Sequence, residues 1–136
     1  MALKFVISEK GKSYQLEKEV PIIGKKIGDI IEGSLLELSG YELTITGGSD
    51  NAGFPMKNDI EGQGRRGMLT SKGLGFKGTK KIKKKTFRHE GMKKKKTLCG
   101  NTIDQNISQV NCSVSKKGEK PLEELLGKKE EEAKDV

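Results

Sequence analysis

The chain has 136 residues, of which 32% are hydrophobic and 4% aromatic, so it is long enough for one modest core and too short for two. Its net charge of +8 favours a polyanionic partner, because summed charge bears on association and not on fold. Two cysteines and one histidine exclude a disulfide framework and a zinc site, and no window approaches the roughly eighteen apolar residues of a membrane helix. We expect a cytoplasmic protein with reduced thiols, no metal, no cofactor and no membrane partner.

The first part of the chain predicts short β-strands. Apolar residues at 3–7 alternate with more polar neighbours, and Gly11 separates them from a second such run at 14–16, which predicts a hairpin. Between residues 21 and 38 the apolar runs are short and interrupted by glycines, which favours bent strands over a long helix. Residues 41–45 alternate again between apolar and polar side chains. The sequence therefore predicts several strands before residue 46.

Strand patterns resume near the end of the chain. Residues 98–103 and 110–114 have the composition and alternation of strands. The segment KPLEELLG at 120–127 predicts a short helix, because Pro121 suits the first helical position and Gly127 suits a C-terminal cap. The run after it is charged and predicts a frayed tail.

These elements predict an all-β fold: a small β-barrel-like body with a long basic arm and a short C-terminal helix. An α+β fold is the second interpretation. We expect one RNA-binding domain at residues 1–120, with the arm at 62–96 inserted and anchored at both ends, followed by the helix and charged tail at 121–136. The predicted core consists of Phe5, Ile7, Leu16, Ile23, Ile30, Leu43, Ile45, Val110 and Val114.

The positive charge is concentrated in one segment. Residues 62–96 contain fourteen Lys or Arg and one acidic residue, Glu90, for a net charge of +13, whereas the rest of the chain, with 13 basic and 18 acidic residues, has −5. Self-repulsion at this density opposes a compact fold, so we expect residues 77–96 to be disordered in the free protein and to become ordered on polyphosphate. The predicted RNA contacts are Arg65, Arg66, Lys72, Lys77, Lys80, Lys81, Lys83, Lys84, Lys85, Arg88, Lys93, Lys94, Lys95 and Lys96.

Among these side chains, Arg65 and Arg66 rank above any single lysine. A guanidinium fits phosphate geometry, and the pair precedes a predicted strand at residues 68–70. Two aromatic rings lie in the same arm, Phe76 and Phe87, and each could stack on an unpaired base, although packing on the body is favoured.

The remaining residues of chemical interest receive ordinary interpretations. His89 is interpreted as a solvated neighbour of Arg88, and Cys99 and Cys112 as small buried apolar groups.

The stretch TGGSDNAGFPM at residues 46–56 predicts a rigid loop. Adjacent glycines permit positive φ or a close backbone approach, Asp50 can accept hydrogen bonds from following amides, and the proline makes Phe54 extended. We expect the loop to close the barrel and bury Phe54 and Met56; the second interpretation is direct contact of its glycine backbone with a nucleic acid. Within this stretch neither G-x-G-x-x-G nor a Walker motif is present, so we expect no nucleotide cradle there. The defining residues are Gly47, Gly48, Asp50, Gly53, Pro55 and Met56.

The segment ITGGSDNAGFPM at residues 45–56 resembles the signature of small-subunit ribosomal protein six of the archaeal and eukaryotic type. Supporting similarities are GDIIEGSLL at 28–36, GYELTITGG at 40–48, GRRGMLTSKGLGF at 64–76, GNTID at 100–104 and SKKGEKPLEELLG at 115–127. The resemblance implies a β-barrel-like body bound to ribosomal RNA and neighbouring ribosomal proteins in the cytoplasmic small subunit, with no catalytic activity. The chain looks like the short archaeal form of this family. Cys99 stands where family members tend to have arginine.

Two other classes of function are alternatives. A different nucleic-acid or polyanion binder, such as a DNA-compacting protein, also fits the charge; an arm for an acidic membrane fits less well, because residues 77–96 contain only Ile82, Phe87 and Met92 as bulky apolar side chains. An enzyme lacks the necessary parts, since the one histidine lies inside the lysine run and no set of zinc ligands is present. We therefore expect no catalytic residues and no small-molecule substrate.

Overall fold

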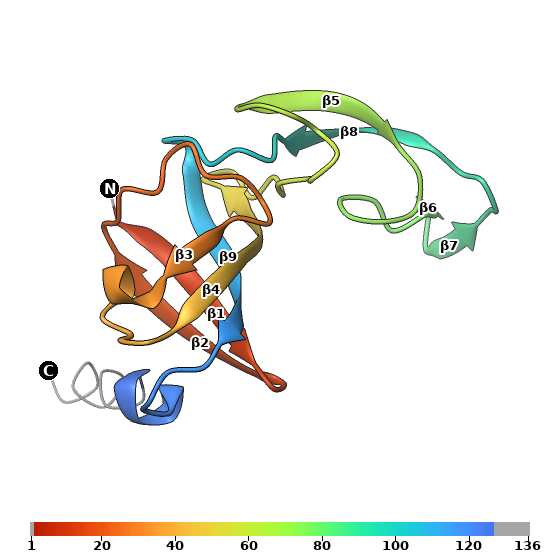
Figure 1. Cartoon of the computed structure of the whole chain (residues 1–136). Helices are drawn as coiled ribbons and strands as arrows, with labels where there is room; N and C mark the ends of the chain where they lie inside the picture. Colours follow the sequence, from red (N-terminus) through yellow and green to blue (C-terminus); the bar gives the residue numbers. More distant parts are fainter. Residues whose placement is uncertain (1, 127–136) are drawn as a thin grey trace, which may run out of the picture.

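The computed structural model describes residues 2–126, and strands dominate this part of the chain (Figure 1). The elements are β1 (Leu3–Glu9), β2 (Lys12–Lys18), β3 (Ile30–Glu32), the 3-10 helix η1 (Gly33–Leu36), β4 (Glu42–Asp50), β5 (Arg65–Thr70), β6 (Thr79–Ile82), β7 (Lys85–Arg88), β8 (Lys94–Cys99), β9 (Ile107–Lys116) and one helical turn at 122–126. Among these residues, no helical segment has the length and apolar character that crossing a membrane requires.

Five strands form the main sheet in the order β2-β1-β9-β4-β3. β1 pairs in parallel with β9, and the other neighbours are antiparallel. The mostly-strand fold is as predicted. The barrel is not confirmed, because the sheet is open: its order ends at β2 on one side and at the three-residue β3 on the other.

The predicted N-terminal hairpin is confirmed. β1 and β2 are joined at Lys10 and Gly11, whose φ angles of 45° and 81° belong to the mirror-image two-residue turn that matches strand twist. Leu3, Phe5 and Ile7 are buried on one face of β1, in agreement with the alternation. The hairpin therefore follows from local sequence alone.

Most of the predicted core is correct, but the choice between adjacent isoleucines is wrong at two places. Ile23 is 58% exposed and Ile30 54%, whereas Ile22 and Ile31 are each 1% exposed. Ile31 lies opposite Leu43 across the sheet, and since successive side chains of a strand point to opposite faces, Ile30 must point outward. Phe5, Ile7, Leu16, Leu43, Ile45 and Val110 are buried as predicted, and Val114 is half-buried against the core.

Two predicted elements near the C-terminus have different bounds in the structure. The predicted strand at 98–103 is observed as β8, four residues earlier, because antiparallel pairing with β5 draws the lysines at 94–96 into a strand. The helical turn covers 122–126, with Leu122 and Leu126 buried. Gly127 and the predicted tail lie outside the described residues.

The segment between β4 and β9 leaves the sheet as two successive strand pairs, which we call the double hairpin (residues 65–99). β5 pairs with β8, and β6 pairs with β7 at the far tip (Figure 1). The predicted strand at 68–70 is confirmed within β5.

Candidate nucleic-acid interface

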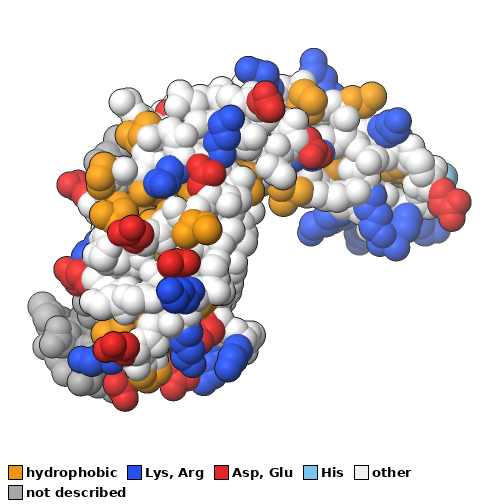
Figure 2. All heavy atoms as spheres, viewed as in Figure 1, with side chains coloured by type: hydrophobic (Ala, Val, Ile, Leu, Met, Phe, Trp, Pro, Cys, Tyr) orange, Lys and Arg blue, Asp and Glu red, His pale blue; other side chains and the backbone are white. Residues whose placement is uncertain are grey.

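The double hairpin carries all fourteen basic residues that were predicted to contact RNA. Thirteen are exposed, and Lys96 is half-buried. Within residues 2–126, Arg65 is the only one of the fourteen in an ion pair. Figure 2 shows Lys and Arg gathered on the lower surface of the tip, whereas acidic and basic side chains are mixed over the main sheet. The positive charge of the double hairpin is therefore available to an external polyanion.

At the tip, strand register distributes the lysines on both faces. Lys80 lies opposite Phe87 and Ile82 opposite Lys85, so these four residues share one face of the β6–β7 pair, and Lys81 lies on the other. The two-residue turn between the strands is itself basic, and Lys83 takes a φ of 55°. The tip thus presents ammonium groups in several directions.

The two arm phenylalanines have different environments. Phe76 is buried, and the Lys96 ammonium lies 6.0 Å from its ring centre, which confirms packing for this ring. Phe87 is 40% exposed, so the favoured packing interpretation is wrong for it. Loop 71–78 folds back far enough to bury the first ring, whereas β7 keeps the second at the tip.

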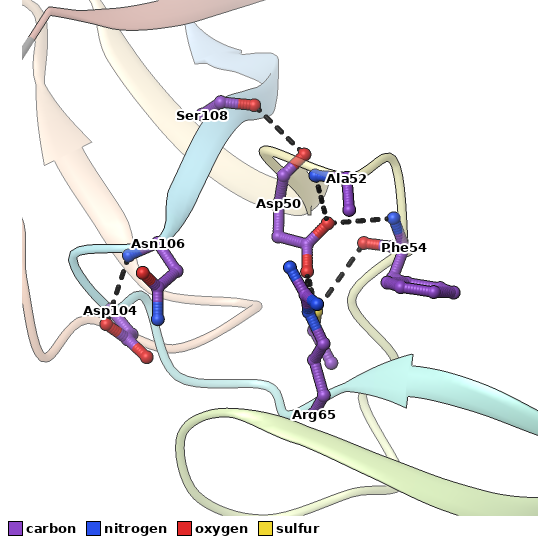
Figure 3. Close-up of polar contacts among 8 residues, drawn as sticks. Asp50, Ala52, Phe54, Arg65, Asp104, Asn106 and Ser108 are labelled. Atoms are coloured by element: carbon purple, nitrogen blue, oxygen red, sulfur yellow. Dashed lines mark hydrogen bonds and ion pairs between the residues drawn. The ribbon is translucent and has the colours of Figure 1, made fainter.

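The Asp50 carboxylate joins the signature loop to the base of the double hairpin (Figure 3). Its Oδ1 accepts a hydrogen bond from the backbone N–H of Ala52 at 3.0 Å, two residues on as predicted, and a second one from the N–H of Phe54 at 2.9 Å, four residues on. Its Oδ2 accepts hydrogen bonds from the Arg65 Nε–H at 2.5 Å and the Cys99 thiol at 3.5 Å. We call Asp50, Arg65 and Cys99 the Asp50 network; it connects the end of β4 to both β5 and β8.

Further contacts fix the same junction. The Arg65 guanidinium lies 5.0 Å from the Phe54 ring centre, and the backbone N–H of Cys99 donates to the Pro55 carbonyl at 2.9 Å. Met56 is buried and Phe54 half-buried against the core. The loop therefore has the architectural role that was favoured, although it joins the sheet to the double hairpin and does not close a barrel.

Two glycines of the signature are required for different reasons. Gly53 has a φ of 88°, a left-handed conformation that favours glycine. Gly48 does not have positive φ, but a Cβ there would lie 2.4 Å from the Gln109 carbonyl oxygen on β9. At Gly47 nothing lies within 4 Å of such a Cβ. The close approach predicted for the glycine pair is therefore to β9 and involves Gly48 alone.

We expect Gly48→Ala to lower the free energy of unfolding by about 2 kcal/mol, because the added methyl group must displace the β9 backbone. Gly47→Ala is the matched control, and we expect it to be neutral or slightly stabilising, since alanine costs less chain entropy in a strand. Urea denaturation of both variants measures the difference. Equal effects at the two positions would contradict the assigned role of Gly48.

The ionisation of the Asp50 network follows from burial and hydrogen bonding. Burial alone would raise the pKa of Asp50, but the hydrogen bonds from the Phe54 amide and then from Arg65 outweigh it, so its pKa lies below the ordinary value of 3.8. Burial, followed by the hydrogen bond to Asp50, raises the pKa of Cys99 to about 11. The thiol thus stays protonated at neutral pH and acts as a donor, not as a nucleophile.

We expect the stabilising effect of Asp50 to depend on acid pH. Since its pKa is lower in the folded state than in the unfolded state, ionised Asp50 stabilises the fold above about pH 4, and this stabilisation is lost as the pH falls through the folded-state value. The free energy of unfolding should therefore differ most between wild type and Asp50→Asn at neutral pH. Denaturation at a series of pH values tests this; a difference that stays constant down to acid pH would contradict it.

Sequence reasoning missed the Asp50–Arg65 pair and the hydrogen-bonding role of Cys99. The residues come from three separate strands, and no spacing in the sequence indicates that they meet. Among residues 2–126, no group of three or more His, Cys, Asp or Glu side chains is placed to hold a metal ion.

Comparison with known proteins agrees with the resemblance seen in the signature loop. The family model described as Ribosomal protein S6e matches residues 1–127. Small ribosomal subunit protein eS6 of Methanothermobacter thermautotrophicus is 49% identical over 135 residues, covering 96% of this chain and all of that protein. The proteins of the same name from Methanosphaera stadtmanae and Methanocaldococcus jannaschii are 45% and 42% identical, covering 97% and 91% of this chain and 98% and 90% of their own lengths.

Members of this family are structural proteins and not enzymes, in agreement with the lack of catalytic parts in the sequence. The match extends over nearly the whole of the chain, including the signature loop, the double hairpin and the main sheet. The chain therefore belongs to the ribosomal protein S6e family.

Proposed function

We propose that the chain is a structural component of the cytoplasmic small ribosomal subunit and binds ribosomal RNA through its double hairpin. The observation that carries this proposal is a set of twelve basic side chains on one strand-built extension that are exposed and, within the described part of the chain, form no ion pair. The names of the archaeal relatives, small ribosomal subunit proteins, support the choice of particle.

The lysines supply affinity and the rest of the protein supplies orientation. Each ammonium group that neutralises a phosphate releases condensed counterions, and this gain does not depend on base sequence. The double hairpin is tied to the main sheet by the Asp50 network and by backbone hydrogen bonds between residues 55–57 and Cys99. The charges are thus presented at a fixed angle to the sheet, which favours a folded RNA of matching shape over an arbitrary polyanion.

Arg65 and Arg66 lie where the double hairpin meets the sheet. Arg65 uses its Nε–H for Asp50, but its side chain is 47% exposed and its guanidinium has four further N–H donors. Arg66 is exposed and lies on the opposite face of β5. In this proposal the two guanidiniums bind phosphates on either side of the hairpin base, next to neighbouring ribosomal proteins.

Sedimentation of the cellular protein through a sucrose gradient tests the proposal. We expect co-migration with the small subunit in moderate salt and release in high salt. Recovery only at the top of the gradient, or with chromosomal DNA, would contradict it. Competition between ribosomal RNA fragments and duplex DNA for the purified protein at one salt concentration separates RNA binding from the DNA-binding alternative.

A further inference from the structure

The tip of the double hairpin contains a hollow of about 830 Å³. Its apolar lining comes from Phe76, Ile82, Phe87 and Met92. Phe76 is buried at the base, whereas Phe87 and Ile82 are 40% and 47% exposed. These apolar side chains are exposed at the far end of the double hairpin, which is the most polar part of the molecule. Packing of the main sheet does not explain their presence there.

Lysines surround these apolar groups. Lys80, Lys81, Lys93 and Lys94 contribute to the lining, and all four are exposed. On β7, Phe87 lies directly opposite Lys80, so the ring and an ammonium group emerge on the same face of the strand pair. The hollow therefore combines a flat aromatic surface with a positive rim.

This combination matches one ligand chemistry. An unpaired nucleotide has a flat apolar face and carries a phosphate on each side, and sequence-tolerant RNA binding elsewhere uses aromatic stacking together with a basic groove. A paired duplex offers the phosphates but hides its base faces. The lysine rim disfavours a cationic or neutral apolar peptide, which would leave the ammonium groups without partners.

We propose that the hollow binds a single unpaired base of RNA, which stacks on Phe87 while the surrounding lysines neutralise the adjacent phosphates. This inference rests on the proposed RNA-binding function and adds to it a site for one nucleotide. Phe87 is the stacking residue, and Ile82 and Met92 flank the base. Recognition is of an unstacked base and not of a particular sequence, since every base has an apolar face.

The test compares two probes: a perfectly paired RNA duplex, and the same duplex with one unpaired adenosine. We expect the full chain to bind the second roughly tenfold more tightly. Phe87→Ala should abolish this preference and leave duplex binding and its salt dependence unchanged. Leu69→Ala, which removes another exposed apolar side chain of the double hairpin outside the hollow, should retain the preference.

A second variant reports on stacking directly. The chain contains no tryptophan, so Phe87→Trp introduces a single tryptophan into the hollow, and its emission can be excited separately from that of the two tyrosines. We expect its emission to be quenched more by the duplex with the unpaired adenosine than by the perfect duplex. This variant keeps an aromatic ring at position 87, so it also controls for damage to the tip in Phe87→Ala.

The outcomes separate the two proposals. Equal binding of both probes with steep salt dependence, or a preference that survives Phe87→Ala, would overturn the nucleotide site and leave RNA binding intact. Absence of salt-dependent binding to either probe would overturn both.

Discussion

Replacing Asp50 with alanine is expected to lower the free energy of unfolding by about 3 kcal/mol. The side chain is 1% exposed, and its loss leaves the amides of Ala52 and Phe54 without their acceptor and the Arg65 guanidinium without its counterion. Hydrogen bonds to a buried charge are worth more than neutral ones, so the effect should exceed that of an ordinary polar substitution. Urea denaturation at neutral pH measures it.

The control for this prediction is Asp59→Ala. The Asp59 side chain is 81% exposed, and its Oδ2 lies 3.9 Å from the Lys57 Nζ. A surface ion pair of this kind contributes little to the free energy of unfolding. We expect its removal to have no resolvable effect on the free energy of unfolding. If the two variants unfold at the same denaturant concentration, the Asp50 network does not stabilise the junction and the structural explanation of the signature loop is wrong.

Neutralising five lysines at the tip of the double hairpin is expected to weaken binding to ribosomal RNA by at least about 100-fold in moderate salt. The variant replaces Lys80, Lys81, Lys83, Lys84 and Lys85 with glutamine. If each lysine binds one phosphate, the slope of the logarithm of affinity against the logarithm of salt should fall by about four. Titration of labelled ribosomal RNA fragments at several salt concentrations gives both quantities.

The matched variant changes net charge by the same amount outside the double hairpin. It replaces the exposed lysines Lys4, Lys10, Lys26, Lys116 and Lys117 with glutamine. We expect a much smaller loss of affinity and little change in salt slope, because these side chains lie among acidic neighbours such as Glu9 and Glu42. Equal losses of RNA affinity in the two variants would show that binding depends on the net charge of the protein and not on the position of the lysines in the double hairpin.

The parts of the fold that the sequence predicted are those that local pattern controls. The alternation at residues 3–7 and 41–45 identifies a buried face whatever the strand pairs with. The pairs at 22–23 and 30–31 are ambiguous, because neighbouring isoleucines are equally apolar. At 30–31 the pairing of Ile31 with Leu43 chooses the buried residue, and residues 22–23 lie in a turn region outside the strands. Closure of the sheet into a barrel likewise depends on whether its two edge strands, β2 and β3, pair with each other, and no single segment of the sequence determines this.

The same distinction holds for the candidate interface. The charge of residues 62–96 is a local property, and the sequence identified it fully. The contact of Asp50 with Arg65 and Cys99 depends on how three strands meet. The sequence therefore predicts only that Cys99 is a small buried group, and not that its thiol is a hydrogen-bond donor. The disorder expected for residues 77–96 in the free protein stays a prediction, to be checked by hydrogen exchange with and without RNA.

Ultraviolet crosslinking of intact small ribosomal subunits, followed by mass spectrometry of the RNA-bound peptides, tests most directly whether the double hairpin is the RNA-binding element. We predict that crosslinked peptides come mainly from residues 65–99, with Phe87 among the modified positions. Crosslinks confined to the main sheet, with none in the double hairpin, would contradict the assignment.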